Sequence, residues 1–188
     1  MFSLRSKNKY KDIIPEIYQN IIERSRSKFF YLNLDVDDSF ESRFDIIILH
    51  SFIIFYFLKN IPDNDKKLSQ ILFDFMFDDF DNNLREMGFG DIAVNKKMKV
   101  FITAFYGRIA NYSKGVDQIQ NDKEDKKFNK AILNNIYKGK KSNKHNLSFF
   151  KQYITSNLDF FNSRTLTVNI EERFRFIDFT TEEVNHER

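Results

Sequence analysis

Four aspartates, Asp74, Asp78, Asp79 and Asp81, are the side chains whose type and spacing come nearest to catalytic chemistry. Carboxylates along one face of a helix can hold Mg²⁺, and the ion can then hold a diphosphate. Such a site needs two adjacent aspartates and a third at the fifth position, but Asn82 occupies that position here. No second aspartate-rich helix is present to complete the site. A Mg²⁺-dependent helical enzyme therefore stays an alternative, and we expect a protein that is not an enzyme.

Other metal and cofactor chemistry finds little support in the sequence. The chain has no cysteine, which excludes disulfides and thiolate metal sites. His50 lies within an apolar stretch, and neither His145 nor His186 stands at a spacing typical of a metal site. We expect His50 to be a hydrogen-bonded core residue. Phosphate-binding loops, dinucleotide motifs and nucleophile motifs are absent, so we expect no metal and no cofactor.

Two groups of lysines favour an anionic partner. Lys96, Lys97 and Lys99 lie in the first turns of a predicted helix, where each cation opposes the helix dipole at a cost of about 0.3 kcal/mol. Either an anionic partner or the aspartate-rich helix before them would offset that cost. Residues 138–144 hold four lysines and no acid, which predicts an exposed basic loop. Both groups could bind ribosomal RNA, and the loop could also contact anionic lipid headgroups, so a ribosome- or RNA-associated adaptor is an alternative function.

Two predicted helices position these charges. Apolar residues recur every three or four positions over residues 68–87 and 94–112, which is the pattern of helices with one buried face. Gly88 follows the first helix, where a left-handed residue commonly ends a helix, and Gly90 makes the turn more permissive. Asp91 should then accept a free backbone N–H as the second helix begins.

Three further contacts are expected within this pair of helices. Asp81 precedes Arg85 by four residues, which is the favourable order for a surface ion pair. Gly107 stands inside the second helix, at a cost of about 1 kcal/mol relative to alanine. We interpret that glycine as a place where another backbone comes close. Arg108 would then reach an acidic group across the contact, with the aspartates of the first helix as candidates.

The remaining patterns predict an all-α fold. We expect a single domain over residues 10–179, an irregular helical bundle of about six helices with a short extended C-terminal segment. A flexible basic N-terminus (1–9) and a disordered tail (180–188) would flank it. The other helices are predicted near residues 10–28, 38–60, 125–137 and 146–161.

The connections and the most buried helix can also be placed. Residues 29–38 have no clear period and predict an irregular connection, and residues 113–124 are polar and predict a loop or a fraying end. The helix after Asp38 or Ser39, one of which should cap it, is apolar nearly all round and should be central. Alternating apolar residues between 166 and 176 predict an extended segment lying on the helices.

The two helices over residues 68–112 and the glycine turn between them form a helical hairpin that contains three motifs. They are Asp79-x-Asp81-x-x-Leu84-Arg85-Glu86-Met87-Gly88-x-Gly90-Asp91, Val94-x-Lys96-Lys97-Met98-Lys99 and Ala104-Phe105-Tyr106-Gly107-Arg108. With these motifs the hairpin resembles the ubiquinol–cytochrome c chaperone family, whose members are assembly factors for cytochrome b of respiratory complex III. A looser similarity includes Arg43-Phe44 and Leu49-His50.

The resemblance implies a non-enzymatic assembly factor whose partner is nascent or newly inserted cytochrome b. It also implies a small partner protein and a contact near the ribosome. We expect a cytoplasmic location with peripheral contact at the inner face of the membrane. The longest apolar run, residues 46–58, is shorter than the roughly twenty residues that a transmembrane helix needs.

The resemblance further implies that the residues that bind a client or a partner lie together in the hairpin. They are Arg85, Glu86, Gly88, Gly90, Asp91, Lys96, Lys97, Lys99, Phe105, Tyr106, Gly107 and Arg108. We hypothesise that an apolar helix of the client lies in a groove with the hairpin as one wall. Acidic and basic rims would then set its register.

Overall fold

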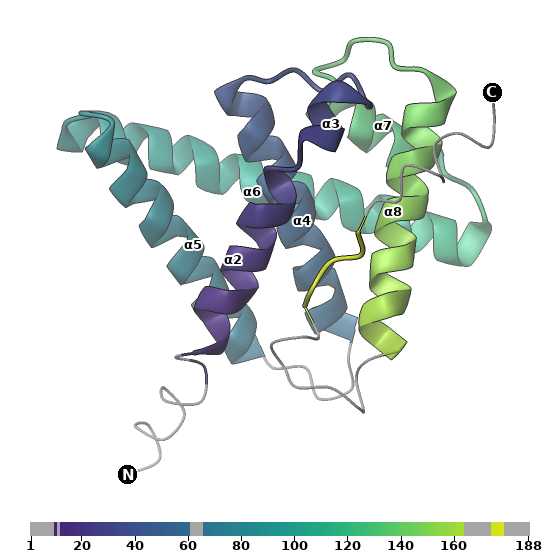
Figure 1. The fold of residues 1–188 in the computed structure, drawn as a ribbon, viewed down its shortest axis with the longest axis horizontal. Coiled ribbons are helices and arrows are strands. Elements are labelled where there is room, and N and C mark those ends of the chain that lie inside the picture. The colour runs from purple at the N-terminus through teal and green to yellow at the C-terminus, as the bar shows by residue number, and fades with distance from the viewer. Residues whose placement is uncertain (1–9, 11, 61–65, 164–173, 179–188) are drawn as a thin grey trace.

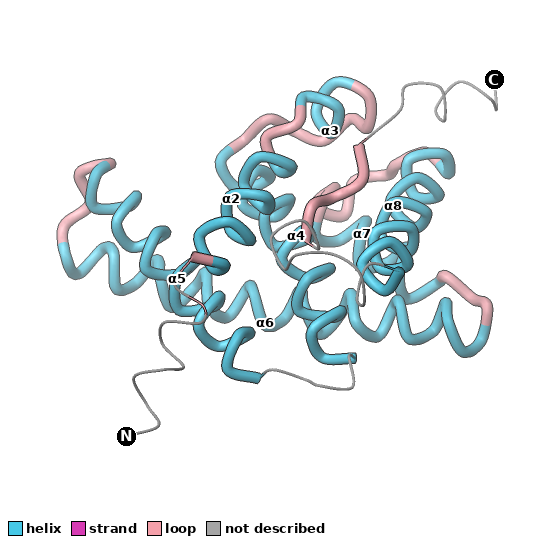
Figure 2. Tube along the Cα trace, turned by 60° about the horizontal axis from the view of Figure 1, so that its bottom comes forward, coloured by secondary structure: helices cyan, strands magenta, loops and turns pink. Residues whose placement is uncertain are grey.

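The computed structural model describes residues 10, 12–60, 66–163 and 174–178 of the 188-residue chain. Helices dominate this part of the chain (Figure 1), and none of it forms a strand (Figure 2). The prediction of an all-α fold is therefore confirmed, whereas the predicted flexible N-terminus and tail lie outside the described residues. The helices are α2 (Ile13–Ser25), α3 (Lys28–Leu32), α4 (Phe40–Asn60), α5 (Lys66–Glu86), α6 (Asp91–Asp122), α7 (Lys126–Asn135) and α8 (Lys144–Ser163).

The centre of the fold is α4, as its apolar sequence predicts. Leu49, Phe52 and Ile53 are fully buried, and α2, α5, α6 and α8 all pack against this helix. Ser39 caps its first turn, because the Ser39 hydroxyl accepts a hydrogen bond from the Ser42 N–H at 3.2 Å. Within the described residues, no helix is both long and apolar enough to cross a bilayer.

His50 is a hydrogen-bonded core residue, as predicted. Its Nδ1 lies 2.8 Å from the Ile46 carbonyl and its Nε2 lies 2.9 Å from the Tyr153 hydroxyl. A carbonyl can only accept, so the ring proton is on Nδ1 and Tyr153 donates to Nε2. Burial lowers the pKa of His50 to about 3, so the ring is neutral at physiological pH.

The prediction of a loop or a fraying end at residues 113–124 is wrong, because α6 continues to Asp122. Figure 2 shows α6 as one continuous helix from the hairpin to the turn before α7. Gly115 and Val116, in this polar stretch, are buried, and Gly115 lies against Phe128 of α7. Tertiary packing therefore extends a helix whose local sequence does not require it.

Residues 174–178, which follow α8 in the sequence, are not helical. Phe174 and Phe176 are buried, and the Phe176 ring centroid lies 5.0 Å from that of His50. The Ile177 N–H donates to the Asn157 side-chain oxygen at 3.0 Å. These residues lie on the helices as predicted, while the alternation at 166–170 falls outside the described residues. The irregular connection predicted at 29–38 contains a short helix, α3.

Candidate functional site

The two helices of the hairpin meet at the predicted glycine turn. Gly88 has a φ of +87°, which is the left-handed region. The Gly88 N–H donates to the Arg85 carbonyl at 2.9 Å, and the Phe89 N–H donates to the Leu84 carbonyl at 3.2 Å. This pair of bonds is the Schellman motif, which satisfies carbonyls at the end of α5. The chain therefore reverses within a few residues and places α6 alongside α5.

Arg85 joins the end of α5 to the start of α6. Its Nε donates to Asp81 at 2.5 Å, which confirms the predicted pair, and its Nη1 also binds Asp91. Asp91 was expected to cap α6, but Gly90 is the N-cap and no side chain caps the helix. The Asp91 carboxylate points to the guanidinium, whose charge competes better than a backbone N–H. Because these residues are exposed, the contacts orient the turn and contribute little stability.

Aromatic side chains fill the contact between α5 and α6. Phe105 is buried, with its ring centroid 5.4 Å from that of Phe73 and 5.4 Å from that of Phe77. Tyr106 stacks on Phe73 at 5.4 Å, but more than half of it is exposed. Of these two predicted site residues, Phe105 is part of the core, and only Tyr106 is available to a partner.

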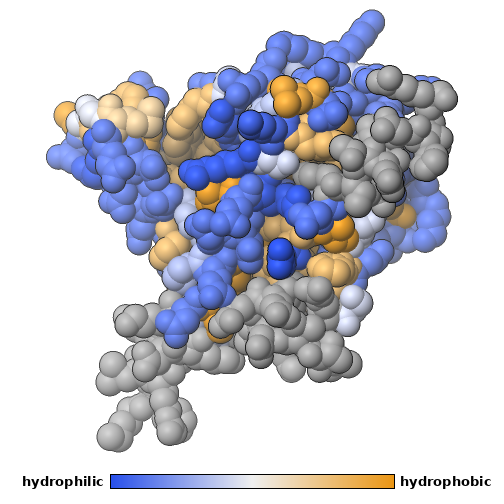
Figure 3. Space-filling model, viewed as in Figure 1, coloured by the Kyte–Doolittle hydropathy of each residue, from blue (hydrophilic) through white to orange (hydrophobic). Residues whose placement is uncertain are grey.

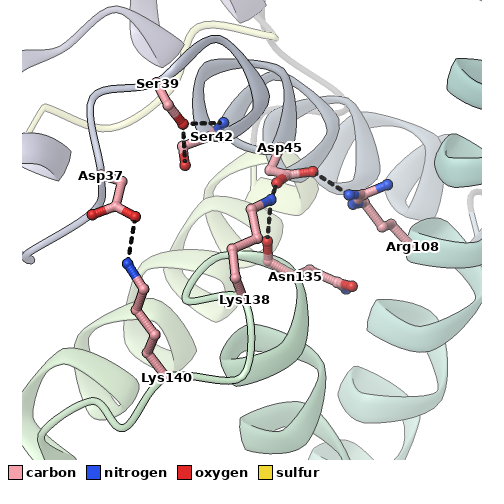
Figure 4. Close-up of polar contacts among 8 residues, drawn as sticks. All are labelled: Asp37, Ser39, Ser42, Asp45, Arg108, Asn135, Lys138 and Lys140. Atoms are coloured by element: carbon pink, nitrogen blue, oxygen red, sulfur yellow. Dashed lines mark hydrogen bonds and ion pairs between the residues drawn. The ribbon is translucent and has the colours of Figure 1, made fainter. Parts of the chain in front are cut away.

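Arg108 reaches an acidic group, as predicted, but that group is not one of the candidate aspartates of α5. Its Nη2 lies 2.6 Å from Asp45 Oδ1 on α4, and Lys138 pairs with the other carboxylate oxygen (Figure 4). Asp45 is buried, and burial also lowers the pKa of Arg108. Arg108 therefore binds the central helix and does not reach the aspartates of α5. The close approach expected at Gly107 is also absent, because a Cβ there would have nothing within 4 Å.

The three lysines in the first turns of α6 keep their charges open to solvent or a partner. Lys96 and Lys99 are exposed, and Lys97 Nζ lies 4.6 Å from the centroid of the Phe89 ring. None of the three forms an ion pair with another described residue. The basic loop differs, because Lys138 binds Asp45 and Lys140 binds Asp37 at 2.8 Å. The stretch on α6 is therefore the better candidate for an anionic partner.

The aspartates of α5 do not assemble a metal site. Asp79 accepts a hydrogen bond from the Tyr18 hydroxyl at 2.6 Å. Burial is the main cause that raises the pKa of Tyr18, and this hydrogen bond is the second. Asp81 binds Arg85, and Asp74 accepts a bond from Gln70. Throughout the described ranges, no three acidic or histidine side chains come together as metal ligands would.

A groove of about 230 Å³ lies between the hairpin and the body of the protein. Helices α2 and α5 meet at one end, through the Tyr18–Asp79 bond, and splay apart toward the hairpin turn (Figure 1). In Figure 3 hydrophobic surface lies inside this groove, and hydrophilic side chains border it. The apolar lining is made chiefly by Ile22, Phe40, Phe44, Phe80, Leu84 and Met87. The structure thus forms an apolar groove with one closed end.

Two apolar residues of the groove are unusually exposed. Phe40 at the start of α4 is 49% exposed, and Met87 at the end of α5 is 60% exposed. They stand on opposite walls, one on the body and one on the hairpin. Large apolar side chains left in water beside an apolar hollow are typical of a surface that binds another molecule.

None of the twelve predicted site residues lines this groove. Nine of them lie exposed around the hairpin, Lys97 and Arg108 are half-buried, and Phe105 is buried. The groove is lined by neighbours of the predicted residues, such as Leu84 and Met87, together with residues of α2 and α4. Sequence reasoning missed Phe40 because it follows a cap and belongs to no apolar stripe. That Phe40 stands across the groove from Met87 follows only from how α4 and α5 pack.

Comparisons with known proteins agree with this architecture. Residues 32–173 match the family model described as ubiquinol-cytochrome C chaperone. The mouse ubiquinol-cytochrome c reductase complex assembly factor 1 is 25% identical over 173 residues, which cover 90% of this chain and 57% of the mouse protein. The human protein of the same description is 23% identical over 158 residues, covering 84% and 51%. The chain thus spans about half the length of these curated relatives.

A solved structure has the same fold. The crystal structure of the Cbp3 homolog from Brucella abortus is 25% identical and superposes with a TM-score of 0.72 over 93% of each chain. The matching family is one of chaperones and not of enzymes, in agreement with the prediction of a non-enzymatic protein. The family model covers most of the chain, and its match includes the hairpin, α4 and the groove residues Phe40 and Met87. The chain belongs to the ubiquinol-cytochrome C chaperone family.

Proposed function

We propose that this protein is an assembly factor for respiratory complex III that holds newly made cytochrome b without catalysing a reaction. Membership of the family supports a chaperone role, and the mouse and human relatives are described as assembly factors of the ubiquinol-cytochrome c reductase complex. The observation that carries the proposal is the apolar groove between α2 and α5, with Phe40 and Met87 exposed on its two walls.

The groove suits one face of an apolar helix. Helices dock into such grooves by inserting side chains spaced three and four residues apart, and the surrounding surface excludes water. A newly made membrane subunit has apolar helices that need protection before they pack. The Schellman turn and the aromatic contact between α5 and α6 hold the hairpin wall in place, so the groove is formed before the client arrives.

Substituting either exposed groove residue should weaken client binding. Phe40→Asp and Met87→Glu place a charge where an apolar side chain would bind, and we expect each to reduce the amount of cytochrome b retained by about tenfold. The measurement is recovery of tagged cytochrome b from solubilised membranes with the immobilised chain. Ile92→Glu is the matched control, because Ile92 is 88% exposed at the hairpin yet does not line the groove. Equal losses in all three variants would contradict docking in the groove.

Ribosomal RNA is a second candidate partner, and the observation that favours it is that Lys96, Lys97 and Lys99 form no ion pair within the described part of the chain. Replacing Lys96 and Lys99 by glutamine should lower the slope of log affinity against log salt by about 1.5, since each lysine that meets a phosphate releases counterions. Titration of labelled ribosomes at several salt concentrations measures that slope. Lys66→Gln with Lys67→Gln makes the same charge change at the far end of α5. If the slope falls equally in both double variants, binding depends on the overall charge of the protein and not on a local contact of Lys96 and Lys99.

A further inference from the structure

The two walls of the groove differ in charge. The body wall carries Arg26 at the end of α2 and Arg43 on α4, and no cation of the hairpin lines the facing wall. The one acidic residue among the described lining residues is Asp79, which accepts hydrogen bonds from Tyr18 at 2.6 Å and from Asn83 at 3.0 Å. An occupant of this groove therefore meets two cations on the body wall, and on the facing wall it meets apolar groups together with the hydrogen-bonded carboxylate of Asp79.

The two arginines are not equivalent. Arg43 donates two hydrogen bonds to Asp38, at 2.6 and 3.0 Å, and its guanidinium carbon lies 5.8 Å from the centroid of the Tyr31 ring. Arg26 is exposed, and its side chain pairs with no carboxylate in the part of the chain that the structure describes. The charge of Arg43 is thus largely satisfied within the protein, while Arg26 lines the groove and forms no ion pair with another described residue.

We infer that the groove selects an apolar helix that carries a carboxylate on the side facing α2, and that Arg26 is the residue that recognises it. This inference rests on the proposed function and specifies the client segment. A guanidinium can bind both oxygens of a carboxylate, which adds geometry as well as attraction. The apolar lining lowers the local dielectric constant, so the ion pair is stronger there than on an open surface. A lysine at the same position on the helix would be repelled, and that repulsion provides selectivity.

Synthetic helices test the inference directly. We would use three labelled amphipathic peptides with one leucine-rich face and a single Glu, Gln or Lys at the border of that face, in versions that place it on either border. Fluorescence anisotropy with the full chain gives each dissociation constant. The Glu peptide should bind about fivefold more tightly than the Gln peptide, and the Lys peptide should bind most weakly.

Charge reversal on the protein provides the decisive comparison. Arg26→Glu should invert the order of the peptides, so that the Lys peptide binds most tightly, and Arg26→Gln should remove the preference. Lys28→Glu makes a similar charge reversal at an exposed residue nearby that does not line the groove. This control should keep the order of the wild-type chain. Thermal melting of each variant identifies any that fail to fold, and Arg26→Gln remains informative if Arg26→Glu is unstable.

The outcomes separate the inference from the proposed function. Equal binding of the three peptides by the folded wild-type chain, lost in Phe40→Asp, would overturn selection by Arg26 and leave the groove as the docking site. An order that Lys28→Glu inverts as well as Arg26→Glu would also overturn it, since only overall charge would then matter. Absence of binding by every peptide would remove the groove from the proposed function and Arg26 with it.

Discussion

Asp45→Ala should destabilise the protein by about 3 kcal/mol, because it removes a buried carboxylate that pairs with two cations. The side chain of Asp45 is 1% exposed, and it pairs with Arg108 from α6 and with Lys138 from the loop after α7. Without Asp45, the two cations would face each other in a poorly solvated site. We place the effect at the lower end of the range for buried pairs, since the side chain of Lys138 is 35% exposed and can rehydrate. Urea unfolding followed by circular dichroism measures the change.

A neighbouring ion pair provides the matched control for this prediction. Asp37 and Lys140 join the segment before α4 to the same loop after α7, at 2.8 Å, but both side chains are exposed (Figure 4). Asp37→Ala should therefore change the free energy of unfolding by less than about 0.5 kcal/mol. Adding Arg108→Met and Lys138→Met to Asp45→Ala should recover part of the lost stability. Similar losses for Asp37→Ala and Asp45→Ala would contradict the importance of burial.

Gly115→Ala should destabilise the protein by about 2 kcal/mol, although alanine favours a helix more than glycine does. A Cβ at Gly115 would lie 2.7 Å from the Phe128 Cα and 3.0 Å from the Phe128 backbone nitrogen. These atoms belong to the backbone of α7, so they cannot move aside without shifting the helix. The substitution would therefore push α6 and α7 apart at a buried contact. The same unfolding measurement applies.

The other glycine of α6 supplies the control for the second prediction. Gly107 lies within the same helix, and a Cβ there would meet no atom within 4 Å. Gly107→Ala should therefore stabilise the protein by up to about 1 kcal/mol, through helix propensity alone. Opposite signs for the two substitutions would show that backbone approach, and not helix propensity, decides the effect at Gly115. A destabilisation of similar size at both glycines would refute this explanation.

Local sequence was sufficient to place the elements of the hairpin. The three-and-four spacing of apolar residues, the glycine at Gly88 and the Asp81–Arg85 pair are each interactions between residues close in the chain, and the structure contains all of them. The same reasoning located α4 as the central helix, since a helix that is apolar nearly all round has no solvated face. The resemblance to the chaperone family also came from this short stretch.

The contacts between distant segments could not be obtained in this way. Arg108 was expected to meet the aspartates of α5, and it binds Asp45 on α4 instead. The close backbone approach expected at Gly107 occurs at Gly115, eight residues later and in a stretch that was expected to be a loop. Periodicity states which face of a helix is apolar, but it does not state which other helix covers that face.

The sequence by itself determined the helical class, the glycine turn, the central helix and the family of this protein, because each of these depends on residue type and short-range spacing. Only the tertiary structure decided where the groove lies, since its walls come from α2, α4, α5 and α6 and are far apart in the chain. It also decided that Phe40 and Met87 face the groove and that Arg26, on the body wall, forms no ion pair with any residue that the structure describes. Such placements follow from the packing angles of whole helices, which depend on the fit of many side chains at once.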